Sequence, residues 1–212
     1  MAYALRLPAP ENRVPTKVEE RVFTAFTRTL RLEPRSAWLQ AKGIEEDTAR
    51  RWEVGAWVGG GMLSGCVAVR LHDPQGHPLG YAGRRLDPAS AAARGKWVFP
   101  PRLPKSSLLY GMHRVHGRRV VVTECPWGVL RLAQLGIDAV GLLGVGLSGL
   151  QREHFACFDQ VIALMDGDAA GRAASRSLAR TLGAAVVELP DGMDPDDLGD
   201  AELSEKLLPF LT

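Results

Sequence analysis

The chain has 212 residues, of which 46% are hydrophobic and 24% charged, with 26 Lys and Arg against 24 Asp and Glu. This apolar content and small net charge exclude a disordered chain, and the length allows one large domain or two small ones. The sequence has neither the long apolar run of a membrane helix nor the apolar core of a signal peptide, so it predicts a cytoplasmic protein without a membrane partner. Three widely spaced cysteines argue against a disulfide framework and a structural zinc site.

Opposite charges are concentrated in two separate segments. Residues 84–119 contain nine Lys or Arg and one acid, a net charge of +8, whereas residues 186–212 contain eight acids and one lysine, a net charge of −7. A basic segment in a near-neutral protein is typical of a polyanion partner, and an acidic segment is typical of metal ligands. The alternative is that the two segments are solvent-exposed faces of the protein that attract each other and bind no ligand.

The first half of the chain predicts an arm, three helices and a hairpin. Residues 1–13 carry prolines and no periodicity, so we expect a loose arm, followed by a helix from Thr16 to Leu30 on its apolar spacing. Pro34 ends this helix. Two short helices are expected over residues 36–41 and 45–52, then a hairpin turning at Pro74, and an extended basic segment to about residue 110.

From residue 120 short apolar strands alternate with helices. Strands are expected at 120–123, 139–143, 161–165 and 185–189, with helices at 126–135, 150–158, 170–182 and 201–208. Fully apolar strands in this order indicate a parallel sheet with helices on both faces. We therefore expect an N-terminal arm and helix over residues 1–35, a smaller mixed α+β basic subdomain over 36–117, and an α/β domain over 118–212.

Carboxylates follow three of the four strands expected in this domain. Glu124 follows the first, Asp166 and Asp168 follow the third, and Asp194 and Asp196 follow the fourth. Because the carboxyl ends of parallel strands share one sheet edge, these acids would repel one another unless a divalent cation bound there. Hard oxygen ligands suit Mg²⁺ or Mn²⁺. The alternative role is capping of helices and turns, for which Asp168 is well placed.

These motifs, in this order, resemble a toprim domain, and with the segments before them they resemble the core of bacterial DnaG-type primases. The toprim motifs end in Glu124, Asp166-Gly-Asp168 and Asp194-Pro-Asp196. Upstream, the resemblance is carried by Ala37-Trp-Leu-Gln-Ala-Lys-Gly-Ile44, Gly80-Tyr-Ala-Gly-Arg84, Lys96-Trp-Val-Phe-Pro100 and Lys105-Ser-Ser-Leu-Leu-Tyr-Gly111. It covers about residues 36–200.

The resemblance implies a nucleotidyltransferase that makes short RNA primers from nucleotides on single-stranded DNA, in DNA replication. It implies that Glu124, Asp166 and Asp168 are catalytic and that they hold Mg²⁺ or Mn²⁺ together with Asp194 and Asp196. Lys and Arg contacts to the DNA backbone would be salt-dependent and independent of base sequence. Trp97 is expected either to stack on a base or to pack within the subdomain. The residues expected to bind nucleic acid are Arg84, Arg85, Lys96, Trp97, Arg102 and Lys105.

Departures from the family pattern leave other functions open. The family usually has glycine after the glutamate and aspartate four residues after it, where this chain has Cys125 and Gly128. A toprim nuclease, or a weakened toprim subunit that binds nucleic acid or a partner, therefore remain alternatives. A helix N-terminus can lower a thiol pKa, but we interpret Cys125 as a substitution and not a nucleophile.

Two further features bear on partners and ligands. The sequence shows neither the zinc-binding nor the helicase-binding domain usual in these primases, so we expect a separate protein to supply recruitment or template recognition, as in a mobile element. A Gly-x-Gly-x-x-Gly run over residues 144–149 resembles a dinucleotide fingerprint. The short helix after it and the nearby acids argue against that interpretation.

Overall fold

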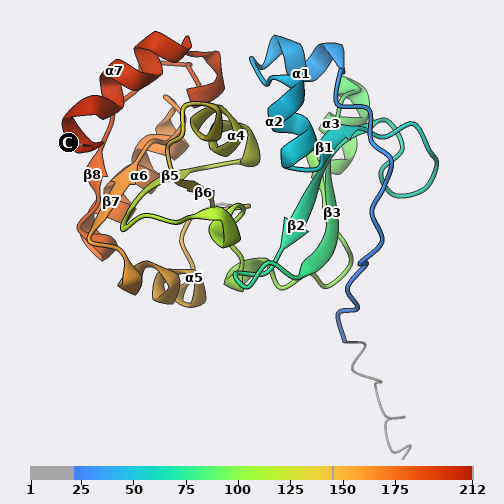
Figure 1. The fold of residues 1–212 in the computed structure, drawn as a ribbon, viewed down its shortest axis with the longest axis horizontal. Helices are drawn as coiled ribbons and strands as arrows, with labels where there is room; N and C mark the ends of the chain where they lie inside the picture. The colour runs from blue at the N-terminus through green and yellow to red at the C-terminus, as the bar shows by residue number, and fades with distance from the viewer. Residues whose placement is uncertain (1–21, 145, 212) are drawn as a thin grey trace, which may run out of the picture.

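The structure is a computed structural model that describes residues 22–144 and 146–211, and they form two lobes lying side by side (Figure 1). The lobe drawn in blue to green contains an antiparallel sheet, in the order β1 (Val54–Ala56), β2 (Cys66–His72), β3 (Pro78–Arg85) and β4 (Trp97–Val98). The other lobe contains a parallel sheet, in the order β6 (Ala139–Gly141), β5 (Arg119–Thr123), β7 (Gln160–Ala163) and β8 (Ala185–Val186). This arrangement confirms the predicted fold class.

Helices cover both faces of the parallel sheet because its strands are apolar on both sides. Val121 and Ile162 point into a core shared with α4 (Pro126–Gln134) and α7 (Asp200–Leu211). Their neighbours Val120 and Val122 point into a second core, under a 3₁₀ turn (His154–Cys157) and α6 (Ala169–Leu182). The helix predicted over residues 150–158 is divided between α5 (Gly149–Glu153) and that 3₁₀ turn.

The two lobes share packing. The core beneath α4 and α7 also contains Leu39 and Val69 from the antiparallel lobe. Tyr110, which precedes the parallel domain, pairs with Gly141 at the edge of β6, and backbone hydrogen bonds run in both directions between them. The upstream segment is therefore held directly against the sheet that carries the acids.

The helix predicted from Thr16 to Leu30 is wrong over its described part. Residues 22–30 contain no helix, and residues 16–21 lie outside the described residues. The backbone groups of this segment are taken by the neighbouring sheet: Phe26 N donates to Leu79 O, and Arg70 donates to the carbonyls of Thr27 and Arg28. A chain bonded to a sheet in this way cannot form helical hydrogen bonds with itself.

The other short helices of the first lobe are capped locally. Ser36 accepts a hydrogen bond from Leu39 N at the start of α1 (Ala37–Ala41), and α2 (Glu46–Arg51) follows, so both predicted helices are confirmed. The prediction of an extended segment to residue 110 is wrong at α3 (Pro88–Arg94), which Asp87 caps through Ser90 N. It is also wrong at the 3₁₀ turn Lys105–Ser107. None of the described helices combines the length and the apolar character needed to cross a membrane.

A candidate acidic centre facing a basic segment

The structure brings the acids after the three strands into electrostatic contact. We call Glu124, Asp166, Asp168, Asp194 and Asp196 the acid cluster. Burial, followed by the charges of Asp194 and Glu124, raises the pKa of Asp166 to about 7. Burial and the charge of Asp168 raise the pKa of Glu124, and burial and the charge of Asp196 raise the pKa of Asp194. The cluster is therefore a partly buried site of strongly negative potential.

Gly167 joins two of the acidic loops. Its N–H donates to Met193 O at 2.8 Å, and its carbonyl accepts from Gly192 N at 2.8 Å. A Cβ at Gly167 would lie 2.0 Å from Pro190 O, so any other residue here would force the loops apart. Arg172 adds a bridge, since its Nη1 donates to Gly167 O at 3.2 Å and to an Asp191 carboxylate oxygen at 2.7 Å.

Three members of the cluster have local partners. Asp168 caps α6, accepting from Gly171 N at 2.7 Å, which is the capping role that the sequence left open. Asp194 and Asp197 cap each other's backbone in the 3₁₀ turn that follows Asp194. Asp196 lies with its Oδ2 atom 2.5 Å from the ammonium group of Lys42.

Lys42 was not predicted as a site residue. It belongs to the upstream segment ending at Ile44, so its place in that motif was visible, but nothing in the sequence pointed to a contact with Asp196. Burial lowers the pKa of Lys42, and the contact with Asp196 together with the charges of Asp197 and Asp194 outweighs this effect, so the net shift is upward. The ammonium group is therefore charged at neutral pH.

The donor atoms of the cluster fit a hard divalent cation. Asp166 Oδ1 is buried and has no hydrogen-bond partner among the described residues, and a buried polar atom of this kind is costly unless a ligand satisfies it. Carboxylate oxygens are the ligands that Mg²⁺ and Mn²⁺ prefer. Within the described ranges, however, no group of three or more His, Cys, Asp or Glu side chains is already arranged as a metal site. Glu124 and Asp166 would hold a cation. Asp168 and Asp194 would join them once their side chains leave the backbone groups that they cap.

The basic segment faces this edge of the sheet. Lys96 is exposed and lies close enough to Glu124 for its charge to oppose the upward shift in the pKa of Glu124. The Lys105 ammonium lies 4.5 Å from the centre of the Phe99 ring. A cavity of about 240 Å³ lies between the two parts of the chain and is lined by Trp97, Phe99, Lys105, Glu124, Cys125, Pro126, Leu143 and Gly144.

The remaining predicted nucleic-acid residues differ in how free they are. Arg85 donates to the carbonyls of Arg94, Gly95 and Trp97, so its guanidinium holds the turn between α3 and β4. Trp97 stacks on Trp127 with the ring centres 5.3 Å apart, which favours the packing role over a free stacking surface. Two further arginines are less engaged: half-buried Arg84, whose Nη1 has no hydrogen-bond partner among the described residues, and exposed Arg102.

Cys125 and Gly128 occupy the positions where the chain departs from the family pattern. Burial, with the charges of Asp196 and Asp166, raises the pKa of the Cys125 thiol to about 12, against the lowering that its place before α4 would give. This supports the interpretation of Cys125 as a substitution. A Cβ at Gly128 would lie 3.0 Å from Thr123 Cβ, so an aspartate here would require Thr123 to shift.

The short helix at the end of the glycine-rich run anchors the basic segment. Ser148 caps α5, which is five residues long, and the Gln151 amide donates to Leu108 O at 2.7 Å and Leu142 O at 2.9 Å. These bonds fix the chain that follows Lys105 against the parallel sheet. The short helix and its engaged cap argue further against a dinucleotide site.

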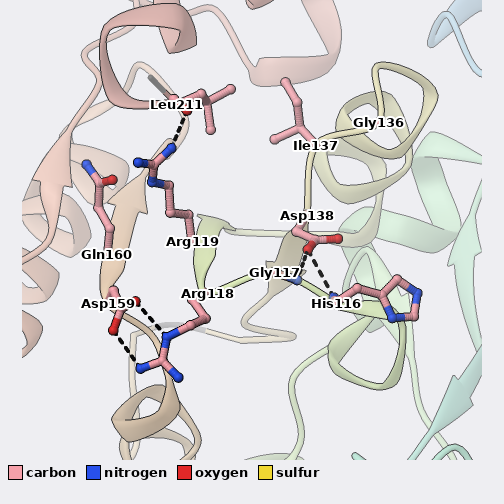
Figure 2. A pocket seen from close by; sticks show the side chains of 10 residues that line it. All are labelled: His116, Gly117, Arg118, Arg119, Gly136, Ile137, Asp138, Asp159, Gln160 and Leu211. Carbon is pink, nitrogen blue, oxygen red and sulfur yellow. Dashed lines mark hydrogen bonds and ion pairs between the residues drawn. The ribbon is translucent and has the colours of Figure 1, made fainter.

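A larger cavity lies at the opposite end of the parallel sheet, where β5 and β7 begin (Figure 2). It measures about 930 Å³, and its charged side chains form bonds within the chain. Arg119 donates to the carbonyl of Leu211. Arg118 forms two hydrogen bonds with Asp159, at 2.6 and 2.7 Å, and Asp138 accepts from the backbone of His116 and Gly117. The side chains of the acid cluster do not line it.

Residues 121–199 match the Toprim-like family, and this range contains the whole acid cluster. The parallel domain is therefore a toprim-like domain.

Bacterial DNA primases are similar to this chain over a longer range than residues 121–199. Identity is 33% over 159 residues with the DNA primase of Geobacillus stearothermophilus, covering 68% of this chain and 26% of that protein. Identity is 34% over 150 residues with the DNA primase of Legionella pneumophila, covering 62% of this chain and 26% of that protein. The chain is thus a homologue of the DnaG-type primase catalytic core, and it spans about a quarter of the length of these curated relatives.

Solved structures share the fold. The RNA polymerase domain of Mycobacterium tuberculosis primase DnaG superposes with a TM-score of 0.67 at 24% identity, covering 82% of this chain and 75% of that one. The zinc-binding and RNA polymerase domains of the Aquifex aeolicus primase superpose with a TM-score of 0.66 at 23% identity, covering 81% of this chain and 54% of that one. A DnaG primase catalytic domain bound to single-stranded DNA superposes with a TM-score of 0.66 at 24% identity, covering 81% of this chain and 70% of that one.

Proposed function

We propose that this chain is a primase core that synthesises short RNA primers on single-stranded DNA, with Mg²⁺ or Mn²⁺ in the acid cluster. The observation that carries the proposal is the position of Glu124. It belongs to the acid cluster, the charge of Lys96 opposes the upward shift of its pKa, and it lines the cavity that Lys105 also lines. Groups suited to a cation and groups suited to a nucleic-acid backbone therefore meet at one side chain. The homology to bacterial DNA primases supports the same assignment.

The chain's own residues suit each part of this reaction. A bound divalent cation would neutralise charge on the transferring phosphoryl group. The Glu124 carboxylate, whose pKa is raised by burial and by Asp168, is a stronger base than an ordinary carboxylate and is suited to accept the proton of an attacking hydroxyl group. Lys96 and Lys105 are exposed and would bind backbone phosphates, which position a strand without reading its sequence.

The test is synthesis of labelled RNA on a single-stranded DNA template with Mg²⁺ or Mn²⁺. We compare the wild type with Asp166→Asn and Asp168→Asn, and expect each variant to lose at least about 100-fold in rate because it removes a carboxylate that would hold the divalent cation. Asparagine caps a helix as well as aspartate, so Asp168→Asn keeps the start of α6 and tests the charge alone. Asp191→Asn is the matched control, since its exposed carboxylate, with 90% of the side chain accessible, pairs only with Arg172 in the structure's described ion pairs.

A weakened toprim subunit is the second candidate, and a specific observation favours it. Gly128 supplies no carboxylate, while Asp168, Asp194 and Asp196 already have partners within the chain. Such a subunit would bind single-stranded DNA with unchanged affinity in EDTA and would make no primer. A toprim nuclease would cleave the strand without synthesis, in a reaction that Asp166→Asn abolishes. Either result contradicts the primase proposal.

A further inference from the structure

Lys42 places a positive charge against the most buried acid of the cluster. It stands at the C-terminus of α1, in the upstream lobe, with its ammonium nitrogen 2.5 Å from Asp196 Oδ2 and 3.5 Å from Asp197 Oδ1. The Asp196 side chain is 2% exposed and the Lys42 side chain is 27% exposed. A carboxylate this deeply buried needs a cation in contact with it, and here the chain itself provides one. Asp196 Oδ2, like Asp166 Oδ1, has no aligned hydrogen bond among the described residues, but unlike Asp166 it contacts an ammonium group.

The backbone on both sides of this ion pair is clamped by Arg131. One guanidinium nitrogen donates to Gly43 O at 2.8 Å, in the residue after Lys42, and the other donates to Leu198 O at 2.8 Å, close to Asp196. The second nitrogen also pairs with Asp200 at 2.7 Å, and the Arg131 side chain is 6% exposed. The contact between Lys42 and Asp196 is therefore set by a buried framework, unlike a chance meeting of long surface side chains.

We propose that Lys42 is the built-in counter-cation of the acid cluster, so that Asp196 is not a metal ligand and divalent cations bind through Glu124, Asp166, Asp168 and Asp194. This inference rests on the metal site of the proposed function. A divalent cation at Asp196 would meet the ammonium group at close range, and the repulsion between the two positive charges would oppose its binding. The upstream lobe thus contributes a charge to the site and removes one acid from the ligand set.

The test is a Mn²⁺ titration followed by electron paramagnetic resonance of the free ion, without DNA or nucleotide. Asp196→Asn should keep the wild-type number of sites, because no ligand is lost, but its Kd should weaken, because Lys42 keeps a charge that Asp196 no longer balances. Lys42→Met should bind Mn²⁺ at least tenfold more tightly, because it leaves Asp196 without its cation. The double variant Lys42→Met/Asp196→Asn should return to the wild-type Kd.

Two controls separate charge from structure. Lys42→Arg keeps the charge and should titrate like the wild type, and Lys206→Met, the same kind of change on α7, should have no effect on Mn²⁺ binding. Thermal unfolding by circular dichroism reports whether each variant folds. If Lys42→Met does not fold, Asp196→Asn and the double variant decide the question, since neither leaves a buried acid without a cation.

The outcomes are distinct from those for primer synthesis. A loss of one Mn²⁺ site in Asp196→Asn, or a double variant that binds Mn²⁺ at least tenfold more weakly than the wild type, would make Asp196 a ligand and overturn the inference. A Lys42→Met variant that folds and binds Mn²⁺ like the wild type would overturn it as well, as would a wild type that binds no Mn²⁺. A wild type that binds Mn²⁺ as expected but makes no primer would contradict the proposed function and leave the assignment of Lys42 intact.

Discussion

At the scale of single residues, Asp166 is the member of the acid cluster whose negative charge is most strongly opposed by its surroundings. It is partly buried, one of its oxygens finds no hydrogen-bond partner among the described residues, and its neighbours are acids. Its pKa of about 7 lies above its ordinary value of 3.8, so the folded chain holds this proton more tightly than the unfolded chain does. The resulting contribution to stability is fully present below about pH 4 and is lost as the pH rises through 7.

Replacing Asp166 with asparagine should therefore remove a pH-dependent cost. In metal-free buffer, we expect Asp166→Asn to be more stable than the wild type at pH 8 by about 1–3 kcal/mol, and the difference to be much smaller at pH 5. Added Mg²⁺ should raise the Tm of the wild type at pH 8 more than that of the variant. The measurement is denaturant unfolding at the two pH values, with Asp191→Asn as control. Equal differences at pH 5 and pH 8 would contradict the raised pKa.

Cys125 should be unreactive for the same electrostatic reason. Its thiol pKa of about 12 leaves almost no thiolate at pH 8, whereas Cys157 is exposed. We expect iodoacetamide to modify Cys157 at least tenfold faster than Cys125 in the native chain, and both to react alike in denaturant. Mass spectrometry of the digested protein at timed intervals measures the two rates. Fast native modification of Cys125 would show that its thiolate is accessible.

At the scale of elements, the junction at Gly167 determines how the loops after β7 and β8 meet. We expect Gly167→Ala to destabilise the fold by about 3 kcal/mol or more, because its Cβ would lie 2.0 Å from a backbone oxygen that cannot move freely. Gly149→Ala is the matched control, since a Cβ at this first residue of α5 would meet no atom of the described chain within 4 Å. Its stability should change by less than about 1 kcal/mol. Urea unfolding measures both, and equal effects would show that Gly167 is not a packing constraint.

Short-range signals account for most elements, and the exceptions have tertiary causes. Capping by Ser36 and the alternation of apolar residues in the hairpin act within a few residues, so the corresponding elements were predicted. The segment before Pro34 has apolar residues at helical spacing, but Arg70 and β3 hold its described part in an extended form. The competing partners come from another part of the chain, and sequence periodicity does not report them.

At the scale of the whole molecule, a basic segment and an acidic edge lie on the two sides of one cavity. If Lys96 and Lys105 bind the backbone of single-stranded DNA, Lys96→Gln and Lys105→Gln should each weaken binding and reduce the slope of log Kd against log salt by about 0.7. Fluorescence anisotropy of a labelled oligonucleotide between about 50 and 200 mM salt measures the slope. Lys206→Gln, on α7, should leave the slope unchanged. An unchanged slope in the first two variants would show that these lysines do not contact phosphate.

The amino-acid sequence by itself determined the parallel domain and the positions of its acids, because strand and helix patterns are local and the acids directly follow the strands. It also separated the basic from the acidic segment. Only the tertiary structure decided what each charged group contacts. Lys42 contacts Asp196, and Arg131 donates to the backbone beside both residues. Arg85 donates to carbonyl groups of the turn between α3 and β4. Such contacts join residues far apart in the chain, and they depend on where whole elements pack, which a pattern of neighbouring residues does not encode.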